Sequence, residues 1–455
     1  MNLRLTTHDP RSALKKTRTE SMLLNIGPAH PAMHGIVRII AELDGEIILN
    51  SDVEIGYLHR AFEKSSEQSG YLQVIPYTDR LNYVSPLINN VGYCLAVEKL
   101  FGLEITERAK YIRVIMSEIS RVTDHLTCVG ASAMELGAFT VFLYMIKARE
   151  MFYQLIEEVT GARLTISYTR IGGVKGDLPP GFEGKCKDII RETRGILKEC
   201  DSLLTKNRIF VDRVKDIGII SKEDAVSYGI TGPFLRSTGV DYDVRRAQPY
   251  LVYDRLEFEV PVGEHGDNYD RYLCRMEEME QSMRIVEQAL GQIPGGPVLL
   301  DMDGNVIPAG NMVDEAKMGR IEGLRENQAD VDPTLAGAHQ SSYAKTQSPD
   351  RRVVLPAKED TYTNIEALMN HFKMIMDGHG IRPPKGEAYL PVEGANGELG
   401  FYVVSDGSGT PYRVRVRPPC FMIMSALSHM IKGDTMADII PTFGSVNMIG
   451  GELDR

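Results

Sequence analysis

The stretch that decides the fold runs from Thr106 to Ser132 and reads TERAKYIRVIMSEISRVTDHLTCVGAS. Its apolar residues recur at steps of three and four, the spacing that puts side chains on one face of an α-helix. They are Ile112, Ile115, Ile119, Val122, Leu126 and Val129. Thr106 followed by Glu107 is typical of a helix start. We therefore predict a long helix whose apolar face packs in the core.

Further helices are predicted on both sides of this one. Met276, Met279, Met283, Val286, Leu290 and Ile293 repeat the same spacing. Methionine is an ordinary core residue, so this second stripe needs no cofactor. The most apolar stretch runs from Leu136 to Ile146, which suits a buried helix and is short of the roughly 20 residues that cross a bilayer. Another helix is predicted from Thr363 to Met376.

Two β-hairpins are predicted near the chain ends. In the first, Gly35 to Leu43 and Glu46 to Leu49 are rich in β-branched residues and flank an Asp-Gly turn. The second joins Leu399 to Val404 with Tyr412 to Val416. Its last strand alternates valine with arginine, and the arginines either form a solvated face or meet an acidic partner. They are Arg413, Arg415 and Arg417.

The fold class is therefore α+β and mainly helical, with small β elements near both ends. We divide the chain into a basic N-terminal arm (1–23), a β region with a histidine loop (24–65), a helical core (66–293), a surface excursion (294–356) and a C-terminal helix plus β-hairpin region (357–455). The excursion is rich in Gly, Pro and Asp. Asp301, Asp303 and Asn305 imitate a calcium loop, but Met312 stands where an acidic ligand is needed, so calcium is not expected.

Composition excludes several functions. The 455 residues are 43% hydrophobic, which supports a large core, and 62 acidic against 51 basic residues argue against nucleic acid as a partner. The six cysteines are single, with no CxxC pair, which excludes a zinc ribbon, an iron–sulfur cluster and a disulfide framework and favours a reducing compartment. They are Cys94, Cys128, Cys186, Cys200, Cys274 and Cys420. The first twenty residues are basic and lack a signal peptide's apolar segment.

Two short segments concentrate residues that can do chemistry. The first, GPAHPAMHG, carries His30 and His34 on a loop stiffened by prolines. Two imidazoles there can carry protons, bind a metal or hydrogen-bond the backbone. The second, PYTDRLNYVSP from Pro76 to Pro86, combines two tyrosines with an acid and an arginine. Its simplest interpretation is a helix start with Asp79 and Arg80 pairing locally.

Several motifs in order carry a family resemblance. They are GPAHPAMHG, IGYLHRAFEK, PYTDRLNYVSP, CLAVEKLFGLEITERA, ELGAFTVF, RIGG, GELGFYVVSDGSGTPYRVRVRPP and GSVNMIGGELDR. Together they resemble the 49-kDa, or D-type, subunit of respiratory NADH:quinone oxidoreductase (complex I), in register from about Leu24 to the C-terminus. The basic arm and the excursion lie outside the resemblance.

This family is itself similar to nickel–iron hydrogenase large subunits, which gives an alternative function. A hydrogenase holds its metals with two CxxC pairs, whose soft thiolates are the required ligands. The first pair would fall at Arg80 to Ser85 and the second at Gly444 to Ile449, and neither segment contains a cysteine. We therefore expect no metal site. A scaffold without chemistry is the third possibility.

The resemblance implies a quinone as substrate, with His34 and Tyr83 as the residues that bind its head group and help to protonate it. It implies that Glu135 supports the quinone site by pairing with His34 and that His30 has a supporting role. It places Arg60 and Arg80 near an iron–sulfur cluster held by the adjacent B-type subunit. An ordinary ion pair of Arg60 with Glu63 or another carboxylate is the competing interpretation of that arginine.

Two positions depart from the family pattern. The family usually has aspartate at the position of Glu135, and many relatives have histidine at the position of Thr165. Threonine does not titrate in the physiological range, so we predict a weaker pH dependence of the cluster's potential. The implied partners are the B-, C-, I- and H-type subunits, and membrane contact goes through them. NADH is used elsewhere in the complex, and the chain alone is inactive. The implied location is the cytoplasmic face of the cell membrane, or the matrix side of the inner membrane in mitochondria.

Overall fold

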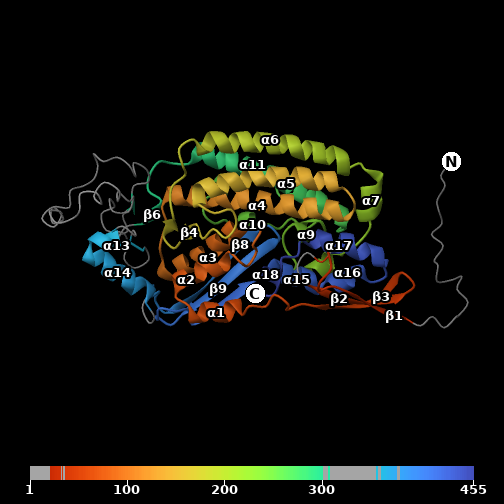
Figure 1. Cartoon of the computed structure of the whole chain (residues 1–455), viewed down its shortest axis with the longest axis horizontal. Coiled ribbons are helices and arrows are strands. Elements are labelled where there is room, and N and C mark those ends of the chain that lie inside the picture. Colours follow the sequence, from red (N-terminus) through yellow and green to blue (C-terminus); the bar gives the residue numbers. More distant parts are fainter. Residues whose placement is uncertain are drawn as a thin grey trace, which may run out of the picture.

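A computed structural model describes residues 21–31, 33, 36–300, 306–307, 355–356, 360–376 and 380–455. Its framework is a layer of long helices that lie side by side in Figure 1: α4 (Glu107–Glu135), α5 (Phe139–Thr160), α6 (Phe182–Leu204) and α11 (Asn268–Gln292). The predicted start of α4 is confirmed, since Thr106 Oγ1 accepts a hydrogen bond from the Ala109 N–H at 3.2 Å. The second predicted helix starts earlier than its apolar stripe, at the cap residue Asp267.

Shorter helices surround this layer. They are α1 (Phe62–Gln68), α2 (Tyr71–Thr78), α3 (Pro86–Phe101), α7 (Arg208–Val214), α8 (Lys222–Ser227), α9 (Pro233–Arg236), α10 (Val244–Ala247), η2 (Tyr253–Arg255), α13 (Asp360–Thr363), α14 (Ile365–Ile375), α15 (Pro419–Ser425), α16 (Leu427–Ile431), η6 (Met436–Asp438), α17 (Ile439–Val446) and α18 (Gly450–Leu453).

Both predicted hairpins are confirmed, and each belongs to a three-stranded antiparallel sheet. The first sheet has the order β1 (Met22–Ile26), β2 (Arg38–Asp44) and β3 (Ile47–Glu54). The second has the order β10 (Arg413–Arg417), β9 (Gly397–Ser405) and β8 (Gly386–Gly394). The arginines of β10 meet acidic residues of the same chain, because Arg413 lies 3.4 Å from Glu67 and Arg415 pairs with Glu63, both on α1.

A third, short sheet brings the start of the predicted excursion into the fold. It consists of β4 (Thr169–Arg170), β5 (Gly173–Val174), β6 (Leu299–Leu300) and β7 (Val306–Ile307). Val298 and Leu299 are buried, whereas Gly295 is exposed, so the start of the predicted excursion is packed from Val298. Most of the excursion, including the positions of the calcium-like pattern, lies outside the described residues.

The core has three parts. One fills the layer of long helices, one lies between the first sheet and the helices α9 and α15–α17, and one joins α2 and α3 to the second sheet. The expectation of a buried helix at Leu136 to Ile146 holds only in part, since Phe139 and Leu143 are more than half exposed. In the described part of the chain, no helix combines the length and apolar character that crossing a membrane requires.

Candidate functional site

The loop between α2 and α3 is built on buried polar contacts. Asp79 is 1% exposed and accepts hydrogen bonds from Asn90 Nδ2 at 2.8 Å and from Ser167 Oγ at 2.5 Å. Burial raises the pKa of its carboxyl group. Asp79 and Arg80 form no direct ion pair in the described residues, because the exposed Arg80 side chain donates to the carbonyl of Pro76, at 2.5 Å. The charge of Arg80 still acts on Asp79 and lowers the pKa of its carboxyl group in part.

The two segments where hydrogenase thiolates would stand meet at a carboxylate of α4. Asp124 Oδ2 accepts hydrogen bonds from Asn82 Nδ2 at 3.0 Å and Ser85 Oγ at 2.7 Å, and its Oδ1 accepts from Asn447 Nδ2 at 2.7 Å. Asp124 is fully buried. Two of its donors belong to the loop between α2 and α3 and the third follows α17, and together they satisfy a carboxyl group whose burial would otherwise be costly.

The network continues from Asn447 to a single cysteine. Asn447 has a positive φ of 53° and donates to Asn396 Oδ1 at 2.6 Å, while Asn396 Nδ2 lies 3.3 Å from Cys420 Sγ. Burial raises the pKa of the Cys420 thiol well above its ordinary value, which keeps the sulfur protonated. A nickel–iron site needs several thiolates, and among the described residues this network offers the single sulfur of Cys420, so the donor set does not fit such a site.

Tyr83 lies beside this network and next to α18. It is half-buried and packs against the core under the first sheet. Burial raises the pKa of its phenol, whereas the backbone of Gly450 and the charge of Arg60 lower it. The phenol is therefore protonated at neutral pH and can donate a hydrogen bond.

Two exposed arginines adjoin the same backbone. Arg60 Nη2 donates to the carbonyl of Arg80 at 2.7 Å. The competing ion pair of Arg60 with Glu63 is absent from the described residues, because Glu63 faces Arg415 and Arg455. Gly451 makes this approach possible: a Cβ there would lie 2.3 Å from the Arg80 carbonyl oxygen.

Glu135 is the last residue of α4 and lies against α17. Its Oε2 would be 2.7 Å from a Cβ added at Gly444, and Ser132 Oγ donates to the Gly444 carbonyl at 2.9 Å. Gly444 and Gly450 are close in sequence, so one short segment borders both Glu135 and Tyr83. His30 is exposed, Thr165 is exposed in the loop before β4, and His34 lies outside the described residues. The pairing of His34 with Glu135 stays a prediction.

A buried carboxyl group near Tyr83 escaped the sequence analysis. Glu452, on α18, is 1% exposed, and its Oε1 accepts a hydrogen bond from the Cys420 N–H at 2.9 Å. Burial raises its pKa to about 7. Asp124 and Asn447 were missed as well, although the motif GSVNMIGGELDR, which contains two of these three residues, was singled out.

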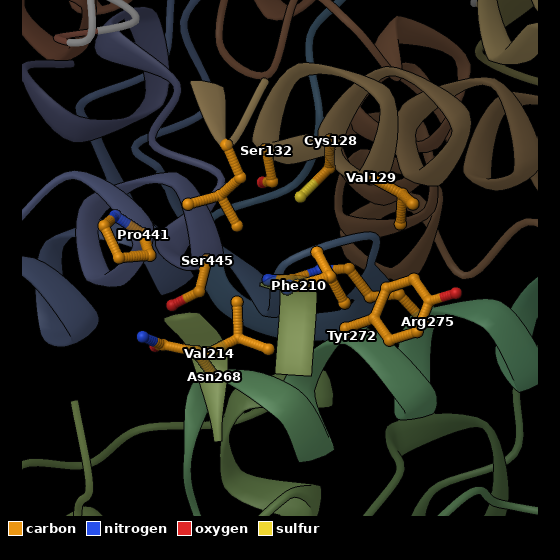
Figure 2. A pocket seen from close by; sticks show the side chains of 11 residues that line it. Cys128, Val129, Ser132, Phe210, Val214, Asn268, Tyr272, Arg275, Pro441 and Ser445 are labelled. Atoms are coloured by element: carbon orange, nitrogen blue, oxygen red, sulfur yellow. The ribbon is translucent and has the colours of Figure 1, made fainter. Parts of the chain in front are cut away.

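Figure 2 shows a small cavity between α4, α7, α11 and α17. Its volume of about 30 Å³ suits a water molecule and is too small for a quinone ring. Arg275 lines it and is only 2% exposed. This cavity cannot hold the head group, so the candidate site is the surface around Tyr83, Arg60, Arg80 and Gly451.

Known proteins similar to this chain share nearly its whole length. The family described as "Respiratory-chain NADH dehydrogenase, 49 Kd subunit" matches residues 135–455. A D-type NADH-quinone oxidoreductase subunit of Sorangium cellulosum (strain So ce56) is 51% identical over 438 residues, which is 96% of this chain and 96% of the relative. The D-type subunit of the same enzyme in Myxococcus xanthus (strain DK1622) is 49% identical over 438 residues, 96% of this chain and 94% of the relative.

A third relative combines two subunit types in one chain. The C/D-type NADH-quinone oxidoreductase subunit of Bdellovibrio bacteriovorus (strain ATCC 15356 / DSM 50701 / NCIMB 9529 / HD100) is 48% identical over 432 residues, which is 95% of this chain and 68% of the relative. The matched family covers more than half of the chain, including Glu135, Asn447 and Glu452. The chain therefore belongs to the family of the 49-kDa subunit of respiratory-chain NADH dehydrogenase.

Proposed function

We propose that this chain forms the quinone-binding site of an NADH:quinone oxidoreductase and that Tyr83 binds the quinone head group. The observation that carries the proposal is the position of Tyr83: a protonated, half-buried phenol held beside Gly450, next to two exposed arginines, Arg60 and Arg80. The names of the relatives, all NADH-quinone oxidoreductase subunits, support quinone as the substrate.

Reduction of a quinone to a quinol takes two electrons and two protons. A phenol with a raised pKa stays an O–H donor at neutral pH, so Tyr83 can hydrogen-bond one carbonyl oxygen of the ring and favour its protonation. His34 is a further proposed hydrogen-bond donor to the quinone ring, and Glu135 is the residue proposed to support His34. A carboxylate beside an imidazole fixes its tautomer and stabilises its protonated form. His30 has a supporting role in the same loop.

The electrons come from outside this chain in our proposal. An iron–sulfur cluster in the B-type subunit supplies them, and NADH is oxidised elsewhere in the complex. Arg60 and Arg80 are both exposed, so their positive charges are available to such a neighbour, where they would favour the reduced cluster. The C/D-type relative from Bdellovibrio supports a C-type partner. The I- and H-type subunits are the proposed route to the membrane, at its cytoplasmic face or, in mitochondria, on the matrix side.

The alternatives make different predictions for the same variant. A hydrogenase-like function conflicts with a donor set that offers only the single thiol of Cys420 among the described residues of this network. A scaffold would be insensitive to the Tyr83 hydroxyl. We therefore test Tyr83→Phe in the assembled complex, with Tyr402→Phe on β9 as the matched control. We expect a fall of at least tenfold in kcat/KM for the quinone, with unchanged electron transfer from NADH to a water-soluble acceptor. Unchanged quinone kinetics would favour the scaffold.

A further inference from the structure

A network of charged side chains is completely buried between α4, α9, α10, α11 and the end of β8. Its carboxylates are Glu118, Asp243, Glu278 and Glu393, and its guanidinium groups are Arg121, Arg236 and Arg245. Each of these side chains is 0% exposed. Nothing in the proposed quinone chemistry uses this network, and the inference below does not rest on that function.

Most members have firm partners. Glu278 Oε2 accepts a hydrogen bond from Arg236 Nη2 at 2.8 Å, and its Oε1 accepts from Arg245 Nη2 at 3.1 Å. Glu118 accepts from Arg245 Nη1 at 3.1 Å and from the hydroxyl of Tyr253 at 2.6 Å. These contacts keep Glu118 and Glu278 ionised: their pKa values are lowered, because the arginines outweigh the effect of burial.

The charges of the network do not balance. Four carboxylates face three guanidinium groups, and a net charge buried this completely is costly. The excess is concentrated at one nitrogen: Arg236 Nη1 lies 2.8 Å from Glu393 Oε1 and 3.4 Å from Asp243 Oδ2. Oxygens of Asp243, Glu278 and Glu393 lie within 4.8 Å of one another. Neighbouring carboxylates disfavour each other's ionised form, so this group of three is where the network would take up a proton.

A buried histidine adjoins the network on the side of Glu278. His125 is fully buried, and its Nε2 lies 3.2 Å from Glu278 Oε2. Its ion-pair partner in the described residues is Glu278, so the crowding of Glu393 and Asp243 around Arg236 Nη1 is a separate feature of the network.

The network also adjoins the solvent. A surface hollow of about 680 Å³ is lined by Asp241, Tyr242, Asp243, Arg246, Phe258 and Glu259, among others. Asp243 belongs to both the hollow and the network, although its side chain is 0% exposed, so the network reaches the wall of the hollow at this residue. No other member of the network lines the hollow.

We propose that this network is a proton-binding site that holds one proton between Glu393 and Asp243 and exchanges it with solvent through the hollow. Binding converts one carboxylate into a carboxylic acid, and release returns the proton to water. The proton resides on Glu393. Burial, and then the charge of Asp243, raises the pKa of Glu393 to about 7, whereas the arginines outweigh burial at Asp243 and lower its pKa.

The titratable and charged groups around Glu393 and its partners in the network come from every element packed there. They are Glu118, Arg121 and His125 on α4, Arg236 on α9, Asp243 and Arg245 on and before α10, Tyr250 and Tyr253 at η2, Glu278 on α11, and Tyr242 and Glu398 beside β9. Each arginine among them already contacts a carboxylate, so none is free to neutralise Glu393 on its own.

Infrared difference spectroscopy of the assembled complex tests this proposal. We expect the wild type to show a carboxylic-acid carbonyl band that disappears as the pH rises through about 7. The band should be missing from Glu393→Gln. It should also be missing at neutral pH from Asp243→Asn, in which three carboxylates balance three arginines. Glu387→Gln, an exposed change on the same strand, should keep the band.

Assembly provides the second readout. Position 393 carries the proton below about pH 7 in this proposal, so Glu393→Gln should assemble, whereas Glu278→Gln should reduce assembly by leaving two arginines without their partner. A Glu393→Gln complex that keeps the band, or that fails to assemble as Glu278→Gln does, would overturn the proposal. A band lost in Glu393→Gln but retained in Asp243→Asn would overturn the shared position of the proton.

Discussion

The strongest structural prediction concerns Asp124, where three distant segments meet. Asp124→Ala removes the acceptor of three hydrogen bonds of 2.7 to 3.0 Å and leaves the donors of Asn82, Ser85 and Asn447 buried. An unsatisfied buried donor costs about 1–3 kcal/mol. Asn447 keeps a second acceptor, Asn396 Oδ1, which reduces the loss. We therefore expect Asp124→Ala to weaken this junction by about 4 kcal/mol, and Ser85→Ala by about 1 kcal/mol.

Hydrogen exchange of the assembled complex measures this effect locally. A loss of about 4 kcal/mol in opening free energy corresponds to a loss of protection of roughly 1000-fold at the amides near Asn82 and Asn447. Asp188→Asn, an exposed change on α6, is the control and should leave these amides unchanged. Equal protection in Asp124→Ala and the wild type would refute the claim that this carboxylate joins the segments.

Four further predictions follow from individual residues. Gly451→Ala should lose about 1–3 kcal/mol of stability and weaken quinone binding, because its Cβ would lie 2.3 Å from a carbonyl oxygen; an unchanged melting temperature would contradict this. Below its unfolded pKa of about 4.5, Glu452 contributes about 3 kcal/mol to the free energy of unfolding, and this contribution is lost as the pH rises to about 7. Glu452→Gln should therefore flatten the dependence of the unfolding free energy on pH over that range. Glu135→Gln should reduce quinone reduction and Glu135→Asp should restore it, whereas full activity in Glu135→Gln would count against the pairing with His34. With Thr165 in place of a histidine, redox titration should give a cluster potential that changes by much less than about 60 mV per pH unit.

The helices and strands whose residues repeat at a regular spacing could be predicted from the sequence. The stripes that define α4 and α11 and the two hairpins were found because each repeats a spacing over many residues. Strand β8 was missed for a physical reason: Pro391 and its glycines hide the pattern, and the strand tolerates them because it lies at the edge of its sheet. Strand β1 follows the basic arm and has no turn signal before it.

The candidate site was predictable only in part. Family motifs pointed to Tyr83, Arg60 and Arg80, which the fold brings together around Gly450 and Gly451. Periodicity gave no sign of Asp124, because the polar face of a helix is normally expected in solvent. In α4 that face is buried too and carries the charged residues of two networks. Such partners come from distant segments, and only the tertiary structure identifies them.

Labelling with a photoreactive quinone tests the central claim most directly. The assembled complex is irradiated with an azido-quinone, and the modified peptides of this chain are identified, with an excess of unlabelled quinone as competitor. We predict competitor-sensitive labelling of peptides that contain Tyr83 or residues 444–451, and loss of that labelling in Tyr83→Phe. Labelling confined to other segments of this chain, or to partner subunits alone, would contradict a quinone site at Tyr83.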